Sequence, residues 1–300
     1  GFIGSHLTNF LLKKGYFVTC YDNLFTGNIN NIKTFSKNRR FKFKKADINK
    51  KINISKNDFI FNLACPASPK YYQLDPIKTI KTNVLGAINI LDYASKYNTP
   101  ILQASTSEIY GNPKIHPQTE TYWGNVNPIG IRSCYDEGKR CAETLFFDYH
   151  REKKLKIKVI RIFNTYGPNM QVNDGRVVSN FIVQAINNKP ITIYGDGKHT
   201  RSFCYVDDLI LGMYKCMQKN KSFKMPINLG NPKEISIKYL AKLILDLTKS
   251  KSKLTYKNLP QDDPTLRKPD INLAKKNLNW SPKIDIETGL KRTINYFKSL

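Results

Sequence analysis

The first 22 residues of the chain decide its fold class, and they read GFIGSHLTNFLLKKGYFVTCYD (residues 1–22). Glycines at positions 1 and 4 open a stretch, 4–15, in which apolar side chains recur on one helical face before Gly15 ends it. A short β-rich run over 17–21 follows and closes at Asp22. A glycine turn, a helix and a strand that ends in a carboxylate about 20 residues on form half of a dinucleotide-binding unit. We therefore expect an α/β protein with a nucleotide at the start of its first helix.

Beyond Asp22 the chain keeps alternating β-rich runs with amphipathic stretches, which predicts parallel βαβ construction. Further strands are expected at 41–46, 58–63, 100–105 and 157–162, with helices at about 77–97, 135–153 and 236–250. We predict a Rossmann-type doubly wound parallel sheet over 1–165 that binds NAD. A smaller C-terminal α/β lobe over 166–300 is expected to bind mainly the substrate, with chain crossings between the two lobes.

The sequence holds no strand in front of the glycine turn at Gly1. In a doubly wound sheet that strand is central, and without it the sheet has two unpaired edges. We therefore expect this chain to be an N-terminally truncated fragment of a longer gene product. The given residues contain no apolar run long enough to span a bilayer. They suggest a cytoplasmic protein, and a membrane anchor upstream of Gly1 stays compatible with that expectation.

The formal net charge of +26 raises the question of a nucleic-acid partner. Lysines are scattered over the chain, and no aromatic-interleaved basic motif for RNA is present. We therefore favour compositional drift and expect no nucleic-acid partner. The six cysteines form no Cys-x-x-Cys pair and have no companion histidine cluster, so we expect free thiols and no metal site.

Tyr135 and Lys139 are candidates for acid–base chemistry because residues four apart lie on one helical face. A tyrosine needs a nearby cation to act as a base near neutral pH, because its ordinary pKa is near 10. A surface pair with this spacing is common by chance, so the spacing alone says little. The context adds weight, since Ser107 and Glu108 follow an apolar strand and so lie at the carboxyl edge of the predicted sheet.

These motifs resemble the extended short-chain dehydrogenase/reductase family, and within it the UDP-glucuronate decarboxylases. The broader resemblance rests on residues 1–7, the Tyr135/Lys139 pair and residues 205–209. The narrower one rests on residues 64–69, 78–83, 106–111, 122–128, 133–143, 161–168, 174–181 and 267–271. It extends over essentially all 300 residues.

The resemblance implies roles for particular residues. Catalysis would be carried by Tyr135, Lys139, Ser107, Glu108 and Arg201. The NAD-binding residues would be Gly1, Phe2, Ile3, Asp22, Asn23, Phe25, Thr26, Gly27, Asp47, Ile48, Leu63, Cys65, Thr82, Tyr135, Lys139 and Thr165. Substrate contacts would come from Lys81, Tyr149, Asn164, Arg176, Arg201 and Arg267. Two positions depart from the family pattern, His199 and Ile131.

The activity implied by the resemblance is NAD+-dependent conversion of UDP-glucuronate to UDP-xylose, through a 4-keto sugar and with the cofactor recycled. Within the same family, a 4,6-dehydratase usually has Thr-Asp-Glu where this chain has Thr106-Ser107-Glu108. A 4-epimerase usually lacks the glutamate. The non-enzymatic alternative, an inactive nucleotide-sugar-binding protein, would call for damage to the set Ser107, Glu108, Tyr135 and Lys139, and all four are present. Family members usually form homodimers through two long helices, which is our expectation here.

Overall fold

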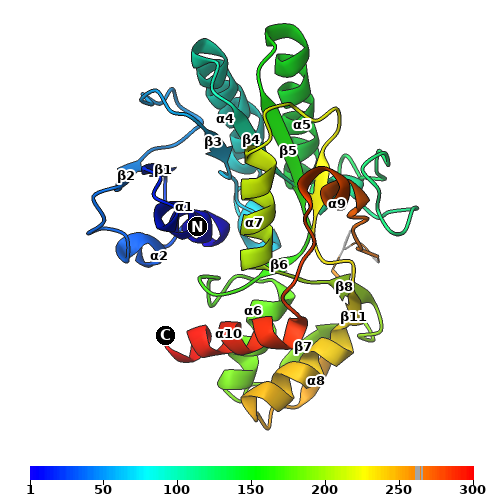
Figure 1. The fold of residues 1–300 in the computed structure, drawn as a ribbon. Coiled ribbons are helices and arrows are strands. Elements are labelled where there is room, and N and C mark those ends of the chain that lie inside the picture. The colour runs from blue at the N-terminus through cyan, green and yellow to red at the C-terminus, as the bar shows by residue number, and fades with distance from the viewer. Residues whose placement is uncertain (261–263, 265) are drawn as a thin grey trace.

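The computed structural model describes residues 1–260, 264 and 266–300, and Figure 1 shows its arrangement. The N-terminal half contains the helices α1 (Phe2–Lys13), α2 (Asn30–Lys33), α3 (Pro69–Tyr72), α4 (Pro76–Tyr97) and α5 (Ser133–Lys153), and the 3-10 helix η1 (Ser107–Tyr110). Its strands are β1 (Val18–Asp22), β2 (Phe41–Lys45), β3 (Ile60–Asn62), β4 (Ile101–Thr106) and β5 (Ile157–Ile162). These bounds confirm the predicted alternation of strands and helices, with ends displaced by one to a few residues.

The main sheet is parallel and has the strand order β10-β5-β4-β3. Its strands β4 and β5 alternate between two cores, since Leu102 and Ile160 belong to one apolar cluster and Ile101 and Val159 to another. The first cluster includes α1 and α7 (Val206–Met217), and the second includes α4 and α5. Helices therefore cover both faces of the sheet, which confirms the doubly wound α/β class.

The strand β10 (Ile227–Leu229) comes from the C-terminal half of the sequence but pairs with β5 of the main sheet. This pairing is of the kind that the predicted crossing between lobes would give, and the division into lobes stays a prediction. The boundary at residue 165 itself stays a prediction.

The strands β1 and β2 form a parallel pair that no ladder joins to the main sheet. Two unpaired edges were expected where the sheet lacks its central strand, and β1 and β3 each have one unpaired side. The unpaired sides of β1 and β3 face one cavity, which Cys20 and Phe61 both line. This is the arrangement expected of a sheet without its central strand. The expectation that the chain is a truncated fragment stays a prediction.

The long helices α4 and α5 lie side by side at one end of the molecule (Figure 1). The helix α4 begins where the Asp75 side chain accepts a hydrogen bond from the Lys78 amide, and it ends at Asn98, whose φ of 50° is left-handed. A Cβ on Gly138 of α5 would lie only 2.9 Å from Asn83 Nδ2 of α4. The glycine therefore allows the two helices to approach closely and fixes where the first turns of α5 lie.

The C-terminal lobe packs α6 (Val177–Ile186), α8 (Ile237–Thr248) and α10 (Ile286–Lys298) around short strands, and Figure 1 shows it below the main sheet. The remaining elements are β6 (Thr165–Tyr166), β7 (Ile191–Tyr194), β8 (Thr200–Ser202), β9 (Cys204–Tyr205), β11 (Glu234–Ser236), β12 (Leu254–Lys257) and α9 (Asn272–Leu278). The predicted helix near 236–250 is α8. None of the described helices is long and apolar enough to cross a membrane.

Candidate active site

One cavity of about 990 Å³ brings most of the predicted site residues together. It lies where β4 and β5 end, and α1, the end of β1 and the C-terminal lobe supply further walls. All the predicted catalytic residues line it, as do all the predicted cofactor residues except Gly27. Among the predicted substrate contacts it contains Asn164, Arg176, Arg201 and Arg267, but neither Lys81 nor Tyr149. Among the described residues, no group of His, Cys, Asp and Glu side chains is arranged to hold a metal ion.

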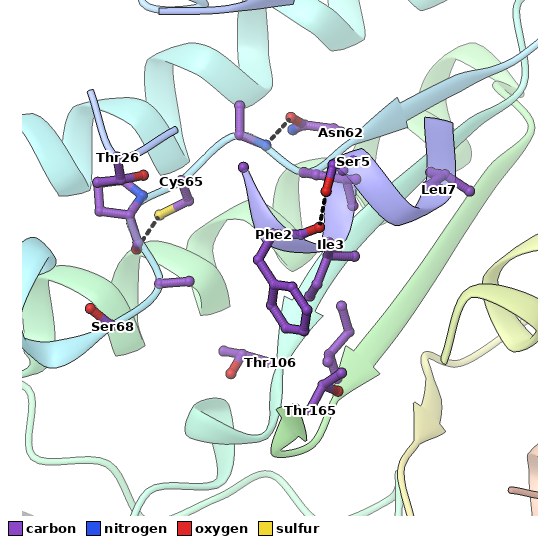
Figure 2. A pocket seen from close by; sticks show the side chains of 18 of the residues that line it. Phe2, Ile3, Ser5, Leu7, Thr26, Asn62, Cys65, Ser68, Thr106 and Thr165 are labelled. Atoms are coloured by element: carbon purple, nitrogen blue, oxygen red, sulfur yellow. Dashed lines mark hydrogen bonds between the residues drawn. The ribbon is translucent and has the colours of Figure 1, made fainter. Parts of the chain in front are cut away.

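The start of α1 forms one wall of the cavity (Figure 2). A Cβ on Gly1 would meet no atom within 4 Å, so the space in front of the first turn is open to a ligand. Ser5 Oγ donates a 2.8 Å hydrogen bond to the Phe2 carbonyl and fixes this turn. The amide groups of a helix start can bind an anion, which suits the predicted pyrophosphate position.

Asp22 ends β1 and is held in place by the turn that follows it. Its Oδ1 accepts a 2.7 Å hydrogen bond from the Leu24 amide. A Cβ on Gly27 would lie 2.9 Å from Asp22 Oδ2, so Gly27 allows the loop to fold against the carboxylate. Gly27 thus acts on the site through Asp22, although it does not line the cavity.

The predicted adenine side of the cavity is ordered by Asp47. Its carboxylate accepts hydrogen bonds of 3.0 Å from the Asn23 side chain and 3.0 Å from the Asn49 amide. Burial opposes ionisation, but these hydrogen bonds outweigh it and lower the pKa of Asp47. Lys78, which the sequence prediction omitted, lies 3.9 Å from the centre of the Phe25 ring on the same side.

Tyr135 and Lys139 lie together on the buried face of α5. Lys139 Nζ is 5.8 Å from the centre of the Tyr135 ring and donates a 2.9 Å hydrogen bond to the Ala104 carbonyl of β4. Burial raises the pKa of Tyr135, and a hydrogen bond with the Thr106 side chain lowers it only in part. Burial of the phenol therefore opposes the expected effect of the Lys139 charge on Tyr135, and that effect stays a prediction. The Lys139 ammonium is bonded to the strand, and desolvation of the phenol dominates.

Two further residues fix the position of Tyr135, and the sequence prediction did not include them. The Tyr72 ring stacks on the Tyr135 ring with centroids 4.9 Å apart and planes 6° from parallel. The Arg132 guanidinium lies over the Tyr72 ring, 6.0 Å from the ring centre. Arg132 precedes Tyr135 by one helical turn, so its spacing could have identified it. Tyr72 lies on a different element, so only the fold could.

Glu108 is bound between two arginines at the end of β4. Arg132 Nη2 donates to Glu108 Oε2 at 2.6 Å, and Arg267 contacts both carboxylate oxygens at 2.6 and 2.7 Å. Burial alone would raise the pKa of Glu108, but the charges of Arg267 and Arg132 outweigh it and lower that pKa. The two arginines therefore favour the ionised form of Glu108, and its catalytic role stays a prediction.

Asp136 is a second buried acid beside this cluster. Its Oδ2 is 3.9 Å from Arg132 Nε, and its Oδ1 has no hydrogen-bond partner among the described residues. Burial and repulsion by Glu108 raise the pKa of Asp136 to about 8, against the opposing charges of Arg132 and Arg267. Asp136 is therefore protonated at neutral pH while Glu108 is ionised.

The remaining predicted arginines are tied to neighbouring groups of the protein. Arg201 donates 3.0 Å and 2.5 Å hydrogen bonds to the carbonyls of Thr200 and Pro264. Arg176 forms a bidentate pair with Asp174 and lies 5.7 Å from the centre of the Phe2 ring. Arg267 also donates to Asn164 Oδ1 at 3.2 Å. Arg267 and Arg132, rather than Arg201, are therefore the arginines in contact with the candidate catalytic carboxylate.

The structure does not bring Tyr149 and Lys81 to the cavity. Tyr149 follows Tyr135 by 14 positions on α5, which corresponds to about 21 Å along a helix. Its hydroxyl donates to Asp92 Oδ1 of α4 at 2.5 Å. Lys81 is exposed on α4, and Lys78, one turn earlier, lines the cavity instead. Their assignment as substrate contacts stays a prediction without support from this geometry.

A strap of hydrogen bonds lies in the wall of the cavity near β1. It joins the lining residues Thr26, Asn31, Tyr71, Asn169 and Gln171. The Gln171 side chain donates to the Thr26 carbonyl and accepts from the Tyr71 hydroxyl. Asn31 Nδ2 donates to the Asn169 carbonyl at 3.0 Å. The loop after β1 is thus bonded to residues 169–171, which lie between the main sheet and the C-terminal lobe.

The parallel sheet, the glycine turn with Asp22 and the buried Tyr135–Lys139 pair define an extended short-chain dehydrogenase/reductase. Residues 1–293 match the sequence family described as GDP-mannose 4,6 dehydratase. UDP-glucuronic acid decarboxylase 1 of Arabidopsis thaliana is 49% identical over 299 residues, covering 100% of this chain and 68% of the relative. The chain belongs to the UDP-glucuronic acid decarboxylase family.

Two further relatives agree with this assignment. UDP-glucuronic acid decarboxylase 1 of Xenopus tropicalis is 48% identical, covering 99% of this chain and 70% of the relative. Among solved structures, UDP-glucuronic acid 4-epimerase from Bacillus cereus, in complex with UDP-glucuronic acid and NAD, superposes with a TM-score of 0.89 at 27% identity. That similarity covers 100% of this chain and 96% of the epimerase. It confirms the Rossmann-type fold.

Proposed function

We propose that this chain is an NAD+-dependent carboxy-lyase that converts UDP-glucuronate to UDP-xylose through a 4-keto intermediate and restores its cofactor in every turnover. The observation that carries the proposal is that one cavity contains both Tyr135 with Lys139 and Glu108 with its two arginines. The first pair suits oxidation of a hydroxyl, and the second suits an anionic group next to it. The names of the curated relatives support the same reaction.

The residues present fit NAD. The open space in front of α1 suits the pyrophosphate, and the fixed Asp22 carboxylate suits the hydroxyls of the adenosine ribose. The same carboxylate would repel a 2′-phosphate, which favours NAD over NADP. When bound, NAD+ would supply a hydride acceptor that later becomes the donor.

Tyr135 acts first, by taking the proton of the sugar 4-hydroxyl while C4 loses a hydride. Lys139 and Thr106 stabilise the phenolate that this step requires. Stacking against Tyr72 keeps the ring in one orientation, so that little reorganisation is needed in the transition state.

Loss of CO2 follows from the chemistry of the oxidised sugar. With a ketone at C4 and a carboxylate on C5, the sugar is a β-keto acid, so the electrons of the breaking C–C bond move onto the ketone oxygen as an enolate. Ser107 and Tyr135 both line the cavity, which supports a role for their hydroxyls in stabilising that oxyanion. Ionised Glu108 orients Arg132 and Arg267 toward the anionic substrate. A proton from solvent is added at C5 of the enolate, the hydride then returns to C4, and Tyr135 gives its proton back to the C4 oxygen, so that one proton is taken up for each CO2 released.

The alternatives within the family are less well supported. Ser107 stands where a 4,6-dehydratase usually has aspartate, and a 4-epimerase usually lacks a counterpart of Glu108. An inactive binding protein has no need of a buried Tyr135–Lys139 pair, and that pair is intact.

The test is release of CO2 from carboxyl-labelled UDP-glucuronate by the purified protein supplied with NAD+. We expect UDP-xylose in equal amount, and no CO2 at all would overturn the proposal. Tyr135→Phe should lower turnover by about 10³-fold, because it removes the general base. Binding of UDP-glucuronate should change little. Tyr239→Phe on the exposed part of α8 is the matched control and should behave as the wild type.

We also propose a homodimer formed through α4 and α5. Ile77 and Leu85 of α4 are 65% and 45% exposed, which is unusual for large apolar side chains on a long helix. Leu85→Lys should convert the dimer to a monomer in light scattering after size exclusion. A monomeric wild-type protein would contradict this proposal and leave the reaction untouched.

We place the enzyme in the cytoplasm. The six cysteines are all free thiols, which suits a reducing compartment. Cell fractionation of the untagged protein should recover it with soluble markers, and recovery with membranes would contradict the placement.

A further inference from the structure

A second buried glutamate, Glu143, lies behind Lys139 and does not line the cavity. It follows Lys139 by one turn of α5, so the two side chains are neighbours on the helix surface. Both reach consecutive residues of β4, since Lys139 Nζ donates to the Ala104 carbonyl and Ser105 Oγ donates to Glu143 Oε1 at 2.5 Å.

Arg161 of β5 completes the surroundings of Glu143. Its Nε and Nη2 donate to the two carboxylate oxygens at 3.0 and 2.8 Å. Its Nη1 donates to the Tyr110 hydroxyl at 2.9 Å and to the Glu120 carbonyl at 3.1 Å. Glu143 is therefore fixed by three hydrogen bonds and cannot rotate away from the Lys139 side of the helix.

We propose that Glu143, fixed by Arg161 and Ser105, is a positioning residue that serves as the permanent negative charge behind Lys139. This inference rests on the proposed function, because it concerns the lysine of the oxidation step. A purely structural ion pair that fastens α5 to β5 would show the same hydrogen bonds. The two interpretations differ in what happens to Lys139 when either charge is removed.

The groups that face Lys139 are Tyr135 and Glu143 on α5 and Cys65 after β3. Burial lowers the pKa of Lys139, while negative charge on Cys65 and on Glu143 raises it. Burial also raises the pKa of the Cys65 thiol, so Cys65 is uncharged near neutral pH. Glu143 is then the group in this set that carries a negative charge under working conditions.

Opposite substitutions should therefore move Lys139 in opposite directions. Glu143→Gln leaves the positive Arg161 near the lysine, so Lys139 loses its proton at a lower pH. Arg161→Gln leaves the negative Glu143 unbalanced, so Lys139 keeps its proton to a higher pH. The double variant removes both charges and should lie between Glu143→Gln and the wild type, because Glu143 acts on Lys139 more strongly than Arg161 does.

The experiment measures the rate of NADH formation after NAD+-loaded enzyme is mixed with UDP-glucuronate between about pH 6 and pH 10. This range lies below the ordinary lysine pKa of about 10.4, where a lowered Lys139 pKa would be seen. The alkaline decrease of this rate reports loss of the Lys139 proton. We expect it to move down by about one pH unit in Glu143→Gln, a ~10-fold change in proton affinity, and up in Arg161→Gln. Ser105→Ala, which keeps both charges, should shift it slightly downward and serves if the charge variants do not fold.

Glu137→Gln is the matched control, because it removes the same charge from the exposed side of α5, where Glu137 pairs with Arg140. Its alkaline decrease should stay where the wild type has it. Charge variants that lower the rate at every pH without moving this decrease would overturn the inference, and so would shifts in the same direction. If the wild type forms neither NADH nor CO2, the proposed function fails instead.

Discussion

Glu108 and Glu143 are both buried glutamates paired with arginine, yet only Glu108 faces the cavity. The partners of Glu143 are Arg161 and Ser105, which tie α5 to two strands of the sheet. The partners of Glu108 are Arg132 and Arg267, which also line the cavity. The same ion-pair chemistry therefore stabilises the fold in one place and presents positive charge to a ligand in the other. All three arginines are similarly buried, and what differs is that Arg132 and Arg267 line the cavity while Arg161 does not.

The strongest test of this difference is the stability of Glu143→Gln. Removing the carboxylate leaves Arg161 buried without its counter-charge, which should lower the free energy of unfolding by about 3–5 kcal/mol. For a chain of this size the melting temperature should fall by about 5–8 °C. Glu143→Gln with Arg161→Gln should lose less than Glu143→Gln alone in calorimetry. If the double variant lost as much free energy of unfolding as Glu143→Gln or more, the cost would not come from an unpaired Arg161, and the contrast with Glu108 would be wrong.

Glu108→Gln should show the reverse pattern. We expect turnover to fall by about 10²–10³-fold, because Arg132 and Arg267 lose the carboxylate that orients them. Its melting temperature should fall less than that of Glu143→Gln, because Arg267 keeps its hydrogen bond to Asn164 and Arg132 keeps Asp136 beside it. Parallel measurement of CO2 release and thermal unfolding checks both statements. A variant that loses stability but keeps turnover would show that Glu108 is structural.

A smaller effect is expected at Asp136, which shares Arg132 with Glu108. Its raised pKa, about 8, means that the folded protein binds a proton that the unfolded chain releases near its ordinary pKa of 3.8. The stability contributed by this proton is present in full below about pH 4 and is lost as pH rises toward 8. Asp136→Asn carries no titrating group, so its melting temperature should fall less than that of the wild type between pH 5 and pH 8, a window chosen inside these pKa values. If the melting temperatures of the wild type and of Asp136→Asn fall equally with pH, a group other than Asp136 causes the decrease.

The smallest expected effect extends the comparison to the rim of the cavity. Lys78→Ala should weaken NAD+ binding by about 2–5-fold, because it removes a cation beside Phe25 that is worth ~0.5–1 kcal/mol. Lys81→Ala, one turn further along α4 and pointing outward, is the matched control and should bind NAD+ as the wild type does in isothermal titration. Equal losses in both would indicate a general effect of surface charge.

The sequence was sufficient for features that depend on local pattern. The helix α1, the strand that ends at Asp22 and the Tyr135–Lys139 spacing are each written within one short stretch, and the structure has all of them. Interactions between residues that are far apart in the sequence could not be predicted in this way. Arg267 is 159 positions from Glu108, so the ionised state of that glutamate could not be deduced before the two were brought together.

Position along a single helix explains the remaining differences. Tyr149 lies on the predicted helix, but it extends too far from Tyr135 to reach the same cavity. Lys81 and Lys78 both fall on α4, and only the packing of that helix determines which one faces the ligand. The pairing of β1 with β2 apart from the main sheet likewise depends on contacts between strands that periodicity does not encode.

The strap that joins Thr26 and Asn31 to residues 169–171 has a consequence for how the protein is supplied with oxidant. A reaction that restores its cofactor in each cycle has no need to exchange it. Hydrogen bonds that close this wall of the cavity would therefore not slow turnover. The protein would then be isolated with its dinucleotide already in place. Its flux would follow the concentration of sugar nucleotide and be insensitive to the ratio of oxidised to reduced dinucleotide in the cell.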